Sequence, residues 1–187
     1  MKKKLPAWLA LFSICVVCAV LLAVMLVLGY IESMLPALTS VPGIKLGLSN
    51  GVLIFAVYMM DIPSAYLLML LKVLLSGFLF GNPSTMMYAG AGGVLSLTGM
   101  VLLSRVKDLN PVTVSMVGGV LHNVGQIALA MLILRTPSLL YYMAVLMLAG
   151  LACGALTGIC ARQVMKHLKH AGQASRTLEK EYSEEKK

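Results

Sequence analysis

Six apolar runs separated by short polar segments organise this chain. They cover residues 5–30, 44–60, 64–80, 86–103, 111–134 and 138–161. A helix needs about 20 apolar residues to cross the hydrocarbon core of a bilayer. The pattern therefore predicts an all-α fold, a polytopic membrane bundle of six transmembrane helices over residues 1–161, followed by a basic and then mixed-charge cytoplasmic tail over residues 162–187. The second and third runs are short, so we expect them to tilt little or to be partly re-entrant.

Composition supports the same class. The chain of 187 residues is 59% hydrophobic and 12% charged, with a mean hydropathy of +0.91. These values are typical of an integral membrane protein and not of a soluble domain. The first run follows three lysines, as in a signal peptide, but it is longer than a signal peptide's apolar region and no convincing cleavage site follows, so we expect it to remain as a helix.

The distribution of Lys and Arg predicts the orientation of the bundle. Twelve of these residues fall on one face of the predicted topology, and only Lys45 and Arg135 fall on the other. The positive-inside rule then places both termini in the cytoplasm of the cell and segment 42–50 outside. The formal charge of +8 follows mainly from this topology. We therefore expect the lipid bilayer, and not nucleic acid, to be a partner.

Small residues recur every fourth position in two of the runs. The last run carries Gly150, Gly154 and Gly158, and the first carries Ala19 and Ala23. Small residues at this spacing let transmembrane helices approach closely. The glycines predict packing inside the bundle. Spacing alone leaves open whether Ala19 and Ala23 meet another helix of the chain or a separate protein.

We expect no metal and no cofactor. The cysteine pairs Cys15/Cys18 and Cys153/Cys160 lie inside apolar runs, where thiols mostly serve as small packing residues. The pair His167 and His170 has no further ligands nearby in the sequence and fits a solvated basic helix better than a metal site.

Lys72 has the most costly position in the chain. It falls at the middle of the third run, where a lysine costs about 2.5–3.5 kcal/mol on insertion scales. His122, Asn123 and Gln126 fall at a similar depth in the fifth run, so the four residues are expected to meet. The sequence suggests no carboxylate inside the membrane to pair with Lys72. An anionic ligand, water or backbone carbonyls remain as partners, and a ligand cavity and a purely structural network are equally open.

Further polar and aromatic residues are expected at the outer helix ends, where each alone is an ordinary interfacial anchor and the group could form the rim of a cavity. They are Tyr30, Glu32, Lys45, Asn50, Asn82, Tyr88 and Arg135.

Four separated segments together resemble one family. They are PGIKLGLSN at 42–50, KVLLSGFLFG at 72–81, AGGVLSL at 91–97 and HNVGQ at 122–126. In this order they resemble the Gx transporter family, which is also labelled heptaprenyl diphosphate synthase component I. The resemblance implies a fold similar to the substrate-binding S-components of energy-coupling factor (ECF) transporters, which bind a vitamin-like molecule near the outer face.

The resemblance also assigns roles. Lys72, His122, Asn123 and Gln126 would form the polar floor of a substrate site, with Lys45, Asn50 and Arg135 at its rim. By analogy, Ala19 and Ala23 would dock a transmembrane T-component, which works with ATPase subunits. The function implied is a substrate-binding membrane subunit for uptake of a small vitamin-like or isoprenoid-related molecule.

Catalysis by this chain is not expected. It has no Gly-x-x-x-x-Gly-Lys-Ser/Thr loop for ATP. Prenyl chain elongation needs clustered aspartates to hold Mg²⁺ on a diphosphate, and the two aspartates, Asp61 and Asp108, are far apart in the sequence. The alternative function is therefore a non-catalytic membrane accessory component of heptaprenyl diphosphate or quinone metabolism.

Overall fold

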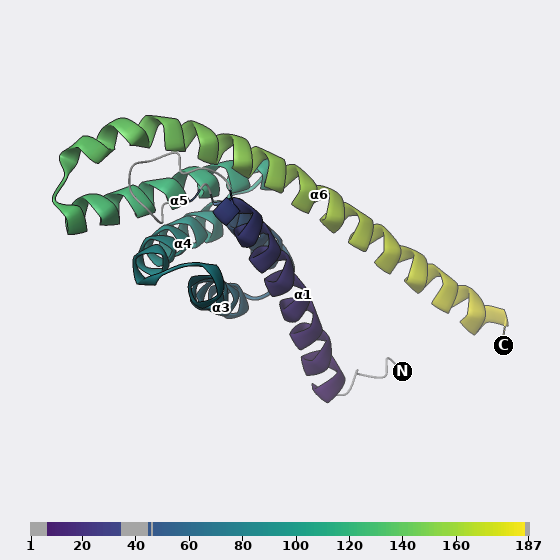
Figure 1. Cartoon of the computed structure of the whole chain (residues 1–187). Coiled ribbons are helices and arrows are strands. Elements are labelled where there is room, and N and C mark those ends of the chain that lie inside the picture. Colours follow the sequence, from purple (N-terminus) through teal and green to yellow (C-terminus); the bar gives the residue numbers. More distant parts are fainter. Residues whose placement is uncertain (1–6, 35–44, 46, 186–187) are drawn as a thin grey trace.

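The computed structural model describes residues 7–34, 45 and 47–185. All regular secondary structure in this part of the chain is helical (Figure 1). The predicted all-α fold with six α-helices is thereby confirmed. The elements in order are α1 (Ala7–Met34), η1 (Leu48–Val52), α2 (Leu53–Met59), α3 (Ile62–Phe80), α4 (Pro83–Ser104), α5 (Pro111–Leu134), η2 (Pro137–Leu139) and α6 (Leu140–Glu185).

Five helices are long and apolar enough to cross a membrane. The candidate spans are Ile14–Met34, Ile62–Phe80, Pro83–Ser104, Pro111–Leu134 and Pro137–His170. The 3₁₀-helix η1 and helix α2 together cover only Leu48–Met59, about 20 Å, whereas the hydrocarbon core is about 30 Å thick. The second apolar run, already short in the sequence, therefore does not span a bilayer as a helix by itself.

Polar caps followed by proline start three of the helices. The side chain of Asp61 accepts a hydrogen bond from the Ser64 amide at the start of α3, and Asn82 and Asn110 cap α4 and α5 in the same way. Such a side chain satisfies an amide that has no partner within the helix. Asn82, which the sequence places at an outer helix end, therefore has a structural role as a cap.

Glycines on α6 pack closely against α5, as their spacing predicts. A Cβ atom on Gly150 would lie 2.6 Å from the carbonyl oxygen of Gly119, and one on Gly154 would lie 2.6 Å from that of Ser115. Both neighbours are backbone atoms, so the two helices could not keep this separation with larger residues. The predicted small-residue packing is confirmed.

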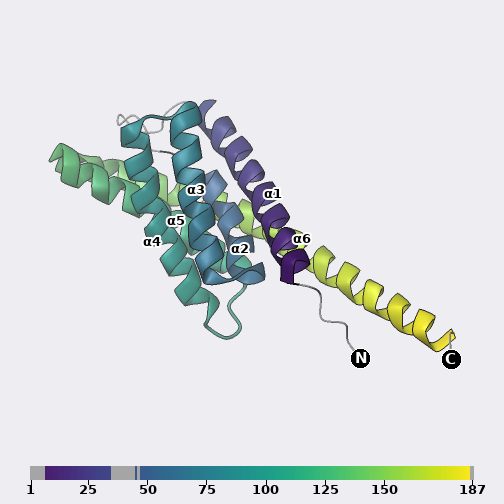
Figure 2. The same cartoon turned by 90° about the horizontal axis from the view of Figure 1, so that it is seen from below.

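Helix α1 packs against α3 and η1 (Figure 2). Its Met25 is buried in the core, whereas Ala19 and Ala23 are exposed. The two alanines therefore do not form an internal packing face, and their docking role stays a prediction. The beginning of α1 and the end of α6 lie toward the same side of the molecule in both views. Lys2, Lys3 and Lys4, which helped to predict the orientation, lie outside the described residues.

Helix α6 continues without a break through residue 161 to Glu185. The membrane domain and the tail predicted from the sequence therefore share one helix.

Candidate functional site

A cluster of buried polar side chains lies where the C-terminal end of α1, the 3₁₀-helix η1 and the middle of α3 and α5 meet. Each of its members is at most 5% exposed: Glu32, Ser49, Asn50, Lys72, His122, Asn123 and Gln126. Buried polar groups in a membrane bundle are costly unless they are paired, so such a cluster is a candidate functional site. We call it the polar cluster.

Asn50 joins Lys72 to His122. Its Oδ1 accepts a hydrogen bond of 2.9 Å from the Lys72 ammonium, and its amide nitrogen contacts Nδ1 of His122. Because an ammonium group only donates, the Asn50 oxygen must face Lys72, and the amide must donate to His122. Nδ1 is therefore an acceptor, which leaves the ring proton on Nε2. Lys72 faces the interior and reaches the α5 polar residues through Asn50, as the sequence predicts.

Gln126 holds the segment that precedes η1. Its Oε1 accepts from the Lys45 amide at 3.0 Å and its Nε2 donates to the Lys45 carbonyl at 2.9 Å. The side-chain amide of Gln126 thus satisfies both the backbone N–H and the backbone C=O of Lys45. The Gly47 amide donates to the Glu32 carboxylate. Segment 42–50, singled out in the sequence, is anchored through its described residues, whereas residues 42–44 and 46 lie outside the described part.

Gly47 has both the conformation and the space that only glycine allows. Its φ is +87°, and a Cβ atom there would lie 2.6 Å from Cδ2 of His122. On the other side of the ring, a Cβ on Gly92 would lie 2.7 Å from Nδ1. The imidazole is therefore held between two glycines, one from the segment before η1 and one from α4.

The side chain of Lys45 extends from the polar cluster toward an aromatic pair. Its ammonium lies 5.3 Å from the centre of the Phe80 ring, and Phe80 packs edge to face on Tyr30 with 5.9 Å between ring centres. A cation over a ring face is attracted by the ring quadrupole. Burial lowers the pKa of Lys45, and the nearby Glu32 carboxylate opposes this shift.

Glu32 corrects one expectation from the sequence. The expectation that no carboxylate inside the membrane could pair with Lys72 is wrong, because Glu32 lines the same cavity as Lys45, Lys72 and His122. In the sequence Glu32 follows the apolar run and was assigned to the outer end. The helix continues to Met34, and Glu32 follows the core-facing Met25 and Gly29 along its inner side. Extending the helical spacing of Met25 and Gly29 by one turn leads to Glu32, so this spacing could have indicated that Glu32 faces inward.

Two small cavities lie against η1: Ser49 lines the first, and Asn50 lines the second. The first, lined by Lys45, Lys72 and His122, measures about 10 Å³, which is room for a single water molecule. The second, also about 10 Å³, lies on the other side and is lined by Asn50, Ser96 and Thr157 among others. The polar side chains and the segment before η1 thus fill nearly all the space between these helices.

Two buried polar atoms have no hydrogen-bond partner in the described part of the chain. They are Oγ of Ser96 and Oδ1 of Asn123. The amide nitrogen of Asn123 donates to the Leu146 carbonyl at 2.6 Å, so this residue also ties α5 to α6. Unpaired buried polar atoms are uncommon in folded proteins. No pattern in the sequence indicates Ser96, nor Ser76 and Thr85, which line the first cavity.

Arg135 does not join the polar cluster. It is exposed in a left-handed conformation (φ 50°) at the C-terminal cap of α5. It lies nine residues beyond Gln126, which corresponds to about 13 Å along the helix axis. The structure therefore brings together five of the seven substrate-site residues proposed from the sequence. Asn123 is buried beside them but bonds to α6, and Arg135 stands apart.

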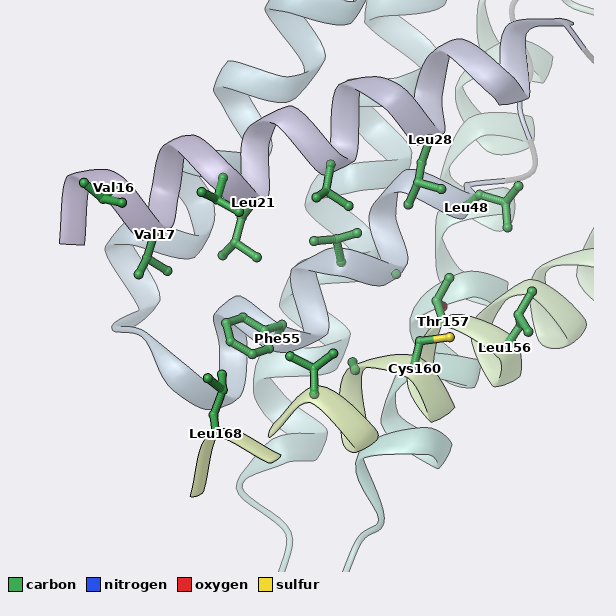
Figure 3. Close-up of a pocket in the computed structure, with 16 residues that line it drawn as sticks. Val16, Val17, Leu21, Leu28, Leu48, Phe55, Leu156, Thr157, Cys160 and Leu168 are labelled. Atoms are coloured by element: carbon green, nitrogen blue, oxygen red, sulfur yellow. The ribbon is translucent and has the colours of Figure 1, made fainter. Parts of the chain in front are cut away.

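An apolar groove runs between α1 and α6, with η1 and α2 at its floor (Figure 3). Its volume is about 560 Å³. Valine and leucine side chains of α1 face side chains of α6 across it, with Phe55 of α2 between them. The Thr157 hydroxyl at its edge is satisfied by the Cys153 carbonyl at 2.8 Å, so the groove offers almost no polar group to a partner.

The described residues contain no group of three His, Cys, Asp or Glu side chains suited to a metal ion.

The fold and the polar cluster define the class: a multi-pass helical membrane protein with a buried, charged site at the middle of α3 and α5. Comparison with known families assigns it further. The chain matches the family described as heptaprenyl diphosphate synthase component I over residues 21–164, and it belongs to that family. The match covers the helices from the middle of α1 to the membrane part of α6. No curated protein and no solved structure matches the chain.

Proposed function

We propose that this protein is the substrate-binding membrane subunit of a transporter, similar to an ECF S-component, which takes up a small vitamin-like or isoprenoid-related molecule. The observation that carries the proposal is the buried polar cluster, in which side chains from α1, η1, α3 and α5 converge on Lys72. A network that served only to fix helix register would not need two cations beside one carboxylate.

The charges indicate what the site would accept. Lys45, Lys72 and Glu32 line one cavity, and together they leave an excess of one positive charge. A ligand with an anionic group would complete the balance. Gln126 would offer further hydrogen bonds if the Lys45 backbone released it, and Asn123 is kept as a candidate from the sequence. The side chains now bond to one another, so a ligand would replace the contacts of Asn50 and of the segment at Lys45 and Gly47.

Energy would have to come from partner proteins. The sequence lacks a phosphate-binding loop, so the proposal includes a T-component and ATPase subunits, with Ala19 and Ala23 as candidate docking residues. Both alanines are exposed on α1 and are free to meet another protein.

Substitution of Lys72 tests the site. Lys72→Met keeps the length of the side chain and removes its charge, and Lys107→Met removes an exposed cation and serves as the matched control. Native mass spectrometry of each gently purified variant measures the small molecules that it retains. The control should retain the same molecule as the parent, whereas Lys72→Met should fold and lose it. A folded Lys72→Met variant with undiminished ligand occupancy would refute the site.

The family description favours a second function, a non-catalytic accessory component of heptaprenyl diphosphate or quinone metabolism. Asp61 and Asp108 lie at different turns, so the described residues offer no aspartate cluster for a catalytic magnesium site. Affinity purification under mild conditions separates the two functions. A T-component and ATPases should accompany the protein in the first case, and a prenyl synthase in the second.

We also place the protein in the cell membrane with both termini in the cytoplasm. Reporter fusions after Asn82 and after Lys107 should then report opposite sides, because these residues follow α3 and α4, which cross in opposite directions. If both fusions reported the cytoplasm, the assignment of these two spans would be wrong.

A further inference from the structure

The second small cavity, which we call the hydroxyl cavity, lies where α4, α5 and α6 meet η1. Its polar lining consists of Asn50 of η1 and of one hydroxyl from each long helix: Ser96, Ser115 and Thr157. Glycines supply most of the remaining lining, and a Cβ atom on Gly118 would lie 3.4 Å from the Ser96 hydroxyl oxygen. The space that the hydroxyls border therefore exists because these positions lack side chains.

Ser96 does not use the hydrogen bond that its own helix offers. A serine or threonine in a helix can donate to a carbonyl three or four residues earlier. On the same helix, Thr98 donates to Val94 at 2.7 Å and Ser104 donates to Val101 at 2.9 Å. Ser96 is 0% exposed, and its hydroxyl has no partner in the described part of the chain. This hydroxyl borders the hydroxyl cavity instead.

The other polar groups of the lining can each form a further hydrogen bond. Thr157 donates to the Cys153 carbonyl at 2.8 Å, so its oxygen remains an acceptor. Ser115 meets Thr157 only at 3.4 Å, which is long for a bond between two hydroxyls. The two bonds of the Asn50 amide within the polar cluster leave it one N–H and one oxygen lone pair. Groups that can donate and groups that can accept thus border one small space.

From this arrangement we infer that the hydroxyl cavity binds one water molecule, held by Ser96, Ser115 and Thr157. The cavity measures about 10 Å³, which is the room that a single water needs. A buried water typically makes about three hydrogen bonds, and the lining offers enough partners for them. In this position the water joins the polar cluster, through Asn50, to α4 and α6. The inference needs no ligand at Lys72 and so does not depend on the proposed function.

The charges around the hydroxyl cavity favour water over a metal cation. None of the described residues that line it carries a carboxylate. The polar cluster on the other side of η1 has an excess of one positive charge from Lys45, Lys72 and Glu32. A cation in the cavity would be repelled by this excess and would have no anion to pair with. An empty space is also disfavoured, because cavities that stay dry are lined by apolar side chains.

Two methionines of equal burial provide a matched test. Met100 and Met25 are both 1% exposed and both belong to the core, but only Met100 lines the hydroxyl cavity. A short X-ray pulse converts bound water to hydroxyl radicals, which oxidise an adjacent methionine to its sulfoxide. In protein held in nanodiscs, mass spectrometry should show Met100 oxidised several-fold faster than Met25. Equally slow oxidation of the two side chains would overturn the inference.

Two substitutions test whether the cavity causes the difference. Gly118→Ala places a methyl group in the cavity near Ser96 and should reduce the Met100 rate to that of the other core methionine. Gly90→Ala, whose methyl would meet one side-chain atom at 4.0 Å, is the control and should leave the Met100 rate unchanged. Ser96→Ala removes a partner of the water without adding volume, and it should lower the rate even if Gly118→Ala does not fold. A Met100 rate that stays at the parent value in folded Ser96→Ala would contradict the proposed site.

The choice of salt separates water from a cation. The oxidation is repeated in choline chloride with increasing amounts of sodium chloride. A water site predicts that the Met100 rate and the melting temperature do not depend on sodium. A Met100 rate that falls to a plateau as sodium is added, with a matching rise in melting temperature, would assign the cavity to a bound cation and overturn the inference.

Discussion

The hydrogen bond between Asn50 and Lys72 provides a quantitative test of the polar cluster. Asn50→Ala removes the acceptor of the Lys72 ammonium and the donor to His122 at once. Lys72→Met removes the ammonium and leaves Asn50 its bond to His122. A double-mutant cycle between these two changes isolates the energy of the one bond that joins them.

The structure sets the size of this coupling. Hydrogen bonds to charged groups contribute about 1.5–3 kcal/mol in proteins, whereas side-chain pairs within one well-studied membrane protein average about 0.6 kcal/mol and reach about 1.7. The Asn50–Lys72 bond is 2.9 Å long, carries a charge, and joins residues that are 2% and 5% exposed. We therefore expect about 1.5 kcal/mol, at the upper end of the membrane range.

Reversible unfolding in mixed micelles, titrated with a denaturing detergent, gives the free energies. The double variant should be about 1.5 kcal/mol less destabilised than the sum of the two single variants. Lys72→Met combined with Asn82→Ala, which removes the cap of α4, is the control cycle and should be additive within about 0.5 kcal/mol. Equal coupling in the two cycles would refute the bond and, with it, the arrangement of the polar cluster.

Three further predictions follow from the fold. Gly154→Ala should destabilise the protein by about 1–3 kcal/mol, because its Cβ would lie 2.6 Å from the Ser115 carbonyl oxygen. Gly90→Ala, whose Cβ would meet only a Val73 methyl at 4.0 Å, should be neutral or stabilising in the same thermal size-exclusion assay. Replacing Ala19 and Ala23 by Leu should leave the melting temperature unchanged and abolish copurification of a T-component; a loss of folding would instead show that this face is internal. The hydrogen bonds from Ser64 hold the pKa of Asp61 below its ordinary value of 3.8, so this carboxylate stabilises the folded state above that pH and the effect is lost as the pH falls through the lowered pKa. The difference in melting temperature between the parent and Asp61→Ala should therefore shrink as the pH is lowered toward that range; a constant difference across the titration would contradict the assigned cap.

The sequence predicts much of the bundle because the bilayer restricts what each residue can do. Apolar length alone identifies the long helices, and the spacing of Gly150 and Gly154 predicts close packing inside the bundle, which the structure shows to be with α5. Lys72 and His122 could be brought together from the sequence since both lie near the middle of long spans. Depth along a helix is simple to count when helices cross the same layer.

The parts that the sequence could not predict depend on where helices end and how the chain turns. The sequence predicts Glu32 at the outer end because it follows an apolar run, and only the continuation of α1 to Met34 brings it inside. The sequence predicts Asn50 at the rim. In the structure it lies in the short element η1, where its side chain bonds Lys72 of α3 and His122 of α5. The positive charge of Arg135 and its predicted outer position group it with the site, whereas the structure leaves it exposed at the C-terminal cap of α5.

The internal pairing of the polar cluster limits what its polar groups can contribute to binding. Asn50, Lys72, His122 and Gln126 are bonded to one another or to the segment before η1, so a ligand head group would exchange one set of hydrogen bonds for another. Such an exchange has a small net free energy, because each new bond replaces one of similar strength. Burial of apolar surface, at about 25 cal/mol for each Å², involves no such exchange. In the proposed site the charged groups would therefore select the ligand, and the apolar surface that the ligand buries would supply most of the affinity.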